Sequence, residues 1–193
     1  MLDAAARLFG GQRFHEVRME DIAAEATVGK GTLYRYFTDK EELYAALLER
    51  ASRQFIARIE NELHRPGSPR QRLRAVVAAS IAFFDEQPHV SDLIQRAEAH
   101  RDPSRLRPWQ QARQQMQELL LDLLAEAKAE GDFTIRDPEV SIPMLMGGLR
   151  SIVRFGRQPR ARDLAERIVN AFLQGAEMSA ANTALAEGTS LKR

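Results

Sequence analysis

The chain has 193 residues, of which 44% are hydrophobic, and its formal net charge is +1. This size and composition predict a soluble globular protein with one substantial core or two small ones, and the charge argues against a broadly basic nucleic-acid-binding surface. The absence of cysteine excludes disulfides, thiolate zinc sites and cysteine redox sensors. No apolar run approaches the roughly 20 residues that cross a bilayer, and the N-terminus lacks a signal-peptide pattern, so we expect a cytoplasmic protein with no membrane partner.

A first helix is predicted from Leu2 to the glycine pair at 10 and 11. Leu2, Ala5, Ala6 and Phe9 recur at the spacing of one helical face. Residues 1–50 contain seven Lys or Arg and nine Asp or Glu, a net charge of −2. Any DNA contact in this region must therefore rest on individually placed cations.

The stretch from Val17 to Leu43 has the pattern of a helix-turn-helix. Apolar residues fall on one side of a short helix that ends near Ala26, and Leu33 and Phe37 fall on one side of the next helix. The two small apolar faces meet across residues 26–29. In such a unit the second helix enters the DNA major groove and its N-terminal residues face the base edges.

The second helix of this unit supplies most of the predicted DNA contacts. Glycines at 29 and 31 and a small threonine at 32 allow the backbone to approach DNA closely, and Lys30 can donate to guanine O6 and N7. The amphipathic or charged residues after it suit phosphate. The predicted contacts are Arg18, Gly29, Lys30, Gly31, Thr32, Tyr34, Arg35, Tyr36 and Lys40. By periodicity alone, the same residues also fit a solvated helical hairpin.

The runs M-E-D-I-A-A-E-A and G-T-L-Y-R-Y-F-T-D-K-E-E-L resemble the DNA-binding signature of the tetracycline-repressor (TetR) family of bacterial transcriptional regulators. The resemblance covers about the first quarter of the chain. Thr27 stands where the family commonly has Gly, so either Thr27 takes a different turn conformation or the angle between the helices changes. Gly29 replaces the usual Ser or Thr and offers an N-cap without a hydroxyl. The family usually carries residues before the first helix; this sequence begins at that helix, so no contacts from such residues are assigned.

The remaining apolar patterns predict only helices. A long helix over 39–63 follows from apolar residues at four-residue steps, and helices follow over 70–87, 90–97, 108–131, 138–155 and 164–175. Pro88 closes one helix, residues 101–104 read as a loop, and Pro108 suits a first turn. Pro143 should kink its helix or delay its start. The fold class is therefore all-α with about nine helices, the number that the resemblance implies.

The resemblance also divides the chain and assigns its second part. It implies a helix-turn-helix domain over 1–45 and a helical effector-binding and dimerisation domain over 46–179, and we expect residues 180–193 to be a disordered tail. Candidate ligand contacts are Phe83, Phe84, Leu93, Trp109, Arg113, Met116, Met144 and Arg150. Candidate dimer contacts are Gly147, Gly148, Ser151, Ile168, Ala171, Phe172 and Gly175. Plain intramolecular core is the competing interpretation of both sets.

Two other function classes remain open. An enzyme is the first, because the carboxylates at 118, 122, 126 and 130 form a stripe that could bind a divalent metal. The helix that carries them has no Glu-x-x-His pair and the histidines of the chain are scattered, which favours a solvated acidic face instead. A DNA-binding protein that acts through a protein partner, without a ligand, is the second. We expect no catalytic residue, metal or cofactor. The predicted protein is a homodimeric regulator that binds an operator in double-stranded DNA and is released by an unknown small molecule.

Overall fold

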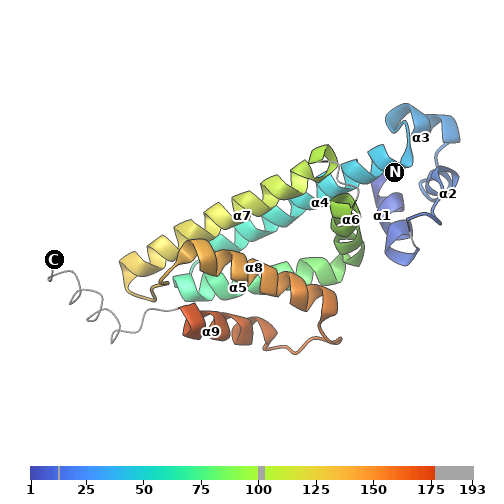
Figure 1. Cartoon of the computed structure of the whole chain (residues 1–193). Helices are drawn as coiled ribbons and strands as arrows, with labels where there is room; N and C mark the ends of the chain where they lie inside the picture. Colours follow the sequence, from blue (N-terminus) through green and yellow to red (C-terminus); the bar gives the residue numbers. More distant parts are fainter. Residues whose placement is uncertain (13, 100–102, 177–193) are drawn as a thin grey trace. The chain divides into compact units, whose positions relative to one another are not determined.

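The computed structural model describes residues 1–12, 14–99 and 103–176, and its secondary structure consists of helices (Figure 1). The prediction of an all-α fold with about nine helices is confirmed for this part of the chain. None of the described helices is both long and apolar enough to cross a membrane. The helices are α1 Leu2–Gly11, α2 Met19–Glu25, α3 Lys30–Tyr36, α4 Lys40–Leu63, α5 Pro69–Glu86, α6 Pro88–Ala99, α7 Pro103–Glu130, α8 Pro138–Phe155 and α9 Leu164–Ala176.

The chain forms two compact units. Among the described residues, one unit lies within 1–57 and 82–114, and the other lies within 58–81 and 115–176. Helices α4, α5 and α7 therefore contribute residues to both units. The first unit holds the helix-turn-helix, so it determines how the candidate DNA-binding side chains are held.

The core of the first unit is built where α1, α2, α3, α4 and α6 bury their apolar faces. Ile22, Leu33, Leu43 and Leu93 are almost completely buried. The same unit contains an aromatic group, in which Phe14 stacks on Phe9 and both rings contact Tyr44. Burial of such large side chains contributes roughly 1.5–3 kcal/mol each relative to exposure, so this core fixes α3 on its neighbours.

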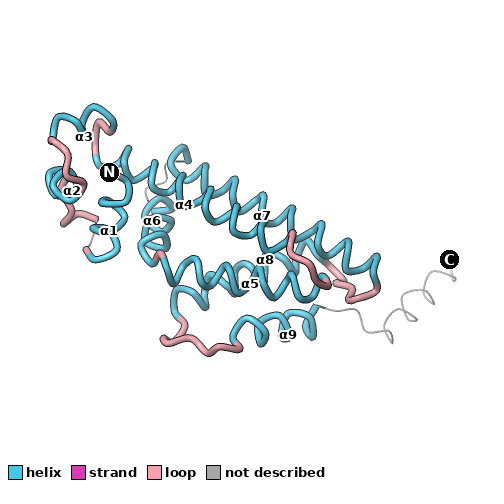
Figure 2. The backbone as a smooth tube through the Cα atoms, turned by 180° about the vertical axis from the view of Figure 1, so that it is seen from behind, coloured by secondary structure: helices cyan, strands magenta, loops and turns pink. Residues whose placement is uncertain are grey.

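The second unit is held by an apolar core and by ion pairs near the end of α7. Leu73, Leu120, Ile142 and Leu173 are buried there. Arg72 donates to the Glu126 carboxylate, which belongs to the acidic stripe of α7. Helices α8 and α9 lie side by side, as the tube in Figure 2 shows.

Two predicted helix starts are wrong, each at a proline. Pro88 begins α6, and α7 begins at Pro103 in place of Pro108, so residues 103 and 104 are helical. Both positions suit proline because the first turn needs no N–H donor, and Pro108 then costs α7 one hydrogen bond near its start. Helix α8 runs from Pro138 to Phe155, as predicted, and Pro143 does not delay its start; Asp137 caps it by accepting from the backbone N–H of Val140 at 3.3 Å. Residues 101 and 102 of the predicted loop and the predicted tail over 180–193 lie outside the described residues.

Candidate nucleic-acid interface

Helix α3 is held by one face and exposes the rest. Leu33 is fully buried and Phe37 half-buried, while Gly29, Lys30, Gly31 and most residues after them are exposed. Gly29 is the N-cap, as the sequence predicts, and it has no side chain that could accept a hydrogen bond from the first turn. The exposed first turn of α3 is therefore open for the backbone to approach another molecule.

The turn between α2 and α3 depends on a left-handed residue. Thr27 has φ 55°, so the alternative of a different turn conformation is wrong. Its N–H donates to the Ala24 carbonyl at 3.0 Å and the N–H of Val28 donates to the Ala23 carbonyl at 2.9 Å. This is the Schellman ending of a helix, in which the left-handed position usually holds Gly. The threonine therefore takes the backbone conformation that glycine would take.

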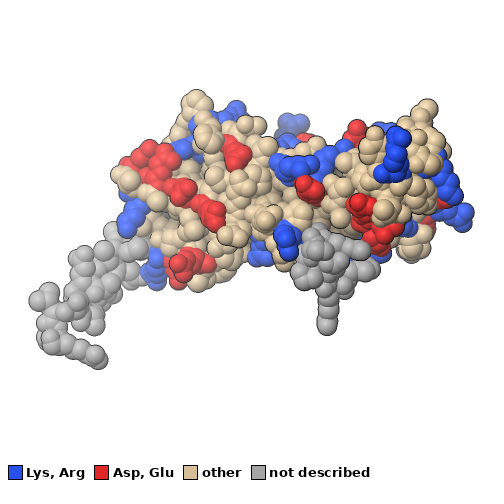
Figure 3. All heavy atoms as spheres, turned by 90° about the horizontal axis from the view of Figure 1, so that it is seen from above, with Lys and Arg blue, Asp and Glu red and all other residues tan. Residues whose placement is uncertain are grey.

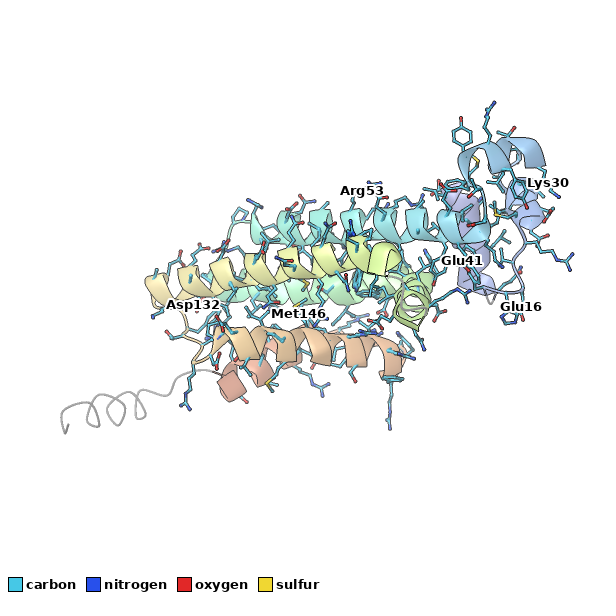
Figure 4. All side chains as sticks on the ribbon, turned by 45° about the horizontal axis from the view of Figure 1, so that its top comes forward. Glu16, Lys30, Glu41, Arg53, Asp132 and Met146 are labelled. Atoms are coloured by element: carbon cyan, nitrogen blue, oxygen red, sulfur yellow. The ribbon has the colours of Figure 1, made fainter. Side chains whose placement is uncertain are left out.

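Lys30, labelled in Figure 4, begins α3 and pairs with a carboxylate of α2. Its Nζ lies 2.5 Å from Glu20 Oε1 and 5.7 Å from the centre of the Tyr34 ring. The hydrogen bond from Lys30 holds the pKa of Glu20 below its ordinary value, and the same bond raises the pKa of Lys30. Both side chains are exposed, 62% and 49%, so solvent screens the pair.

The other predicted contacts on α3 and around it are mostly exposed. Tyr34, Arg35 and Tyr36 face outward, with the Arg35 guanidinium 5.5 Å from the centre of the Tyr36 ring. Arg18 is also exposed at the start of α2, where its N–H donates to Asp21, and Thr32 is half-buried. On the face seen in Figure 3, Lys and Arg are interspersed with Asp and Glu, and no broad basic surface forms there. The exposed cations are thus individually placed.

Lys40 is bound to protein atoms at the start of α4. Its Nζ donates to the carbonyls of Phe14 at 2.6 Å and Val17 at 2.8 Å, and it lies 4.1 Å from the Phe14 ring centre. Burial lowers the pKa of Lys40, and the nearby charge of Arg96 lowers it further. Two of the three ammonium hydrogens are used inside the protein, so the phosphate contact predicted for Lys40 has one donor left.

Arg96 and Glu41 extend this cluster to α6. The Arg96 guanidinium lies 3.5 Å from the Phe14 ring centre and pairs with Glu41 at 3.1 Å. A cavity of about 440 Å³ opens beside these residues. Its lining includes Leu93, one of the candidate ligand contacts; the other lining residues are Phe9, Gln12, Phe14, His15, Tyr44, His89, Asp92, Gln95 and Arg96.

Among the remaining candidate ligand contacts, three aromatic residues lie together. Phe83, Phe84 and Trp109 surround Phe55, whose ring centre is 5.2, 5.8 and 5.5 Å from theirs. Phe55 is not among the predicted contacts; its apolar position within α4 is the only sequence signal for it. Met116 is buried on α7, whereas Arg113, Met144 and Arg150 are exposed, Met144 to 70%.

The candidate dimer residues lie on exposed parts of α8 and α9. Gly147, Gly148, Ser151, Ala171 and Gly175 are exposed, and the candidates at 168 and 172 are half-buried. A Cβ atom added at any of the three glycines would meet no atom within 4 Å. Val140, Met144 and Phe155 add exposed apolar side chains to α8. The glycines therefore do not relieve crowding within the chain.

The acidic stripe of α7 does not gather metal ligands. No group of three or more His, Asp or Glu residues that could hold a metal ion occurs among the described residues. Glu126 is engaged by Arg72, which lowers the pKa of its carboxyl. The other three carboxylates of the stripe, Glu118, Asp122 and Glu130, are exposed.

Two protein-family models match the chain. One, described as bacterial regulatory proteins of the tetR family, matches residues 1–47, and the other, described as a tetracyclin repressor-like C-terminal domain, matches residues 66–176. The crystal structure of the regulator FadR from Bacillus subtilis in complex with stearoyl-CoA is similar, with a TM-score of 0.75 and 20% identity, covering 90% of this chain and 96% of that one. This likeness extends the common fold over both units.

Two curated relatives are similar mainly over the N-terminal part. The transcriptional activator FasR of Mycolicibacterium smegmatis is 38% identical over 91 residues, which cover 47% of this chain and 40% of that protein. The transcriptional repressor KstR of the same organism is 30% identical over 104 residues, which cover 54% of this chain and 51% of that protein. The chain thus spans about half of each relative, or less.

Proposed function

Because the chain belongs to the TetR family of bacterial regulatory proteins, we propose that it is a sequence-specific DNA-binding repressor that a small molecule releases from its operator. The observation that carries the proposal is the exposed first turn of α3, bounded by Gly29 and Gly31 around Lys30 and anchored by the buried Leu33. Such a helix fits the major groove, with Lys30 directed to base edges and Arg18, Tyr34, Arg35 and Tyr36 to phosphates.

The proposed protein acts as a dimer through α8 and α9. Two helix-turn-helix heads must reach successive major grooves, about 34–36 Å apart, so one head alone would bind weakly. The open glycines and exposed apolar side chains of α8 support this surface as the contact between copies, because close approach of helices needs small residues beside a few large ones. The interface then buries the apolar side chains that a single chain leaves exposed.

The proposed effector is mainly apolar. The aromatic group of Phe55, Phe83, Phe84 and Trp109 supports this class, since rings of this kind line adaptable ligand sites. The stearoyl-CoA with which the related FadR forms a complex also carries a long apolar chain. Because α4 contributes to both units, a ligand that tilts it would change the spacing of the two heads and release the DNA.

Control by a protein partner is the second candidate. The exposed apolar side chains of α8 favour it if they remain uncovered in a dimer. A protein partner that docks on this surface would then control DNA binding without a small-molecule ligand. Sedimentation of wild type and of Gly148→Trp separates the candidates, because a dimer that this change on α8 disrupts covers α8 and leaves no such docking surface.

Selection of binding sites from random double-stranded DNA tests the proposed function. The expected product is a palindromic sequence with half-sites about one helical turn apart, because two identical heads read it. A reporter gene behind that sequence should then be silent with the protein present and rise when long-chain acyl compounds are supplied. Enrichment of no sequence would refute the regulator, and higher expression with the protein present would refute the repressor and leave an activator, the function named for the related FasR.

A further inference from the structure

The carboxylate of Glu20 lies directly beside the proposed base reader. Glu20 is the second residue of α2, Lys30 is the first of α3, and their charged atoms are 2.5 Å apart. The Schellman turn at Thr27 brings these two helix starts together. A negative group at this place is unexpected on a DNA-reading surface, because it opposes the attraction of Lys30 to phosphate.

The donors and acceptors of the two side chains complement those that one base pair presents in the major groove. Lys30 offers N–H donors and Glu20 offers carboxylate acceptors next to them. In the major groove a guanine–cytosine pair presents the acceptors O6 and N7 of guanine beside the donor N4–H₂ of cytosine. Lysine is a usual partner of guanine and glutamate of cytosine, so the two side chains match the two halves of the same base pair.

We propose that Glu20 is a specificity-determining residue that reads a G·C base pair together with Lys30. This inference rests on the proposed DNA-binding function. At a G·C pair both side chains exchange their mutual bond for bonds to bases, whereas at other sequences Glu20 keeps Lys30 occupied and repels the phosphates. Glu20 therefore weakens binding to non-cognate DNA more than binding to the operator.

Helix α2 offers a matched control for this role. Glu25 is a second exposed carboxylate of α2, and it pairs with Arg7 of α1 at 2.8 Å. Glu20→Gln and Glu25→Gln each remove one negative charge and one ion pair from the same short helix. Loss of one negative charge changes the electrostatic potential near the DNA in both variants alike. Only Glu20→Gln also removes the carboxylate proposed to read a base.

The test compares wild type and both variants by fluorescence anisotropy on the selected operator, on operators with single base-pair changes and on scrambled DNA. For Glu20→Gln we expect the ratio of operator to scrambled affinity to fall about tenfold, and the preference for G·C at one position of each half-site to disappear. Lys30 becomes available to phosphate, so the salt slope on scrambled DNA should steepen by about one. Glu25→Gln should keep the wild-type ratio and every base preference.

Several outcomes would overturn the inference. An unchanged ratio in Glu20→Gln, or an equal fall in Glu25→Gln, would show that Glu20 acts only through its charge or not at all. A lost preference at an A·T position would show that the pair reads another base pair. Wild-type protein without any sequence preference would instead refute the proposed function and remove the basis of this inference. Circular dichroism melting checks that both variants stay folded.

Discussion

Thr27 keeps the recognition helix in place through a backbone conformation that β-branched residues rarely adopt. Its positive φ allows the two hydrogen bonds that end α2, with the carbonyls of Ala24 and Ala23 as acceptors. The left-handed conformation costs an L-residue roughly 1–2 kcal/mol. Thr27 is exposed, so its side chain gains little burial in return. The helix-turn-helix is therefore less stable than the same fold would be with glycine at position 27.

Replacing Thr27 by glycine should stabilise the protein. Relief of the left-handed conformation outweighs the greater chain entropy that glycine loses on folding, for a net gain of about 0.5–1 kcal/mol. Thermal unfolding followed by circular dichroism should show a melting temperature about 2 °C higher. Ala24→Gly, an exposed position inside α2, is the control and should cost about 1 kcal/mol. Equal losses in both variants would mean that the threonine side chain makes contacts that offset its backbone conformation.

Among the elements of the first unit, Lys40 joins the start of α4 to the segment between α1 and α2. Its bonds to the Phe14 and Val17 carbonyls, with Arg96 on the same ring, tie three elements of this unit together. Asp39 and Glu42 complete the start of α4, because Asp39 accepts from the Glu42 N–H and Glu42 accepts from the Thr38 N–H, both at 2.7 Å. Lys40 thus has a structural role besides its predicted contact with phosphate.

Substitution of Lys40 separates these two roles. Lys40→Met keeps the apolar stem but leaves two carbonyls without their charged donor, so the free energy of unfolding should fall by about 1–3 kcal/mol. Chemical denaturation measures this loss, and Lys128→Met, at an exposed position of α7, should change stability little. Unchanged stability together with a salt slope on DNA lower by about one would identify Lys40 as a phosphate contact alone.

The sequence predicted the elements better than the contacts between them. Apolar periodicity and caps located every described helix, because both act within one or two turns of chain. Pro103 and Pro108 suit a first turn equally, so the start of α7 could not be decided from local chemistry. The prediction that α3 exposes the rest of its surface rested on Leu33 and Phe37 alone, because they form its one apolar face. The partners of Lys30 and Lys40 could not be predicted, because they depend on how separate helices pack.

For the molecule as a whole, the proposed regulation requires two copies joined through α8 and α9. Gly148 tests this surface, because an added Cβ there meets nothing within 4 Å in the single chain. Gly148→Trp should therefore fold normally and block the close approach of a second copy. Sedimentation velocity should give a dimer for wild type and a monomer for the variant. Ala125→Trp, at an exposed position of α7, should remain dimeric. A dimeric Gly148→Trp protein would place the interface elsewhere.

Sequence-specific DNA binding is tested most directly by fluorescence anisotropy on DNA that flanks the protein's own coding region, against scrambled DNA of the same length and composition, at two salt concentrations. We expect tight binding of two subunits to one site in the flanking DNA, with weaker and more salt-dependent binding to the scrambled sequence. Equal affinity for the two DNAs, falling equally with salt, would contradict sequence-specific binding at this site.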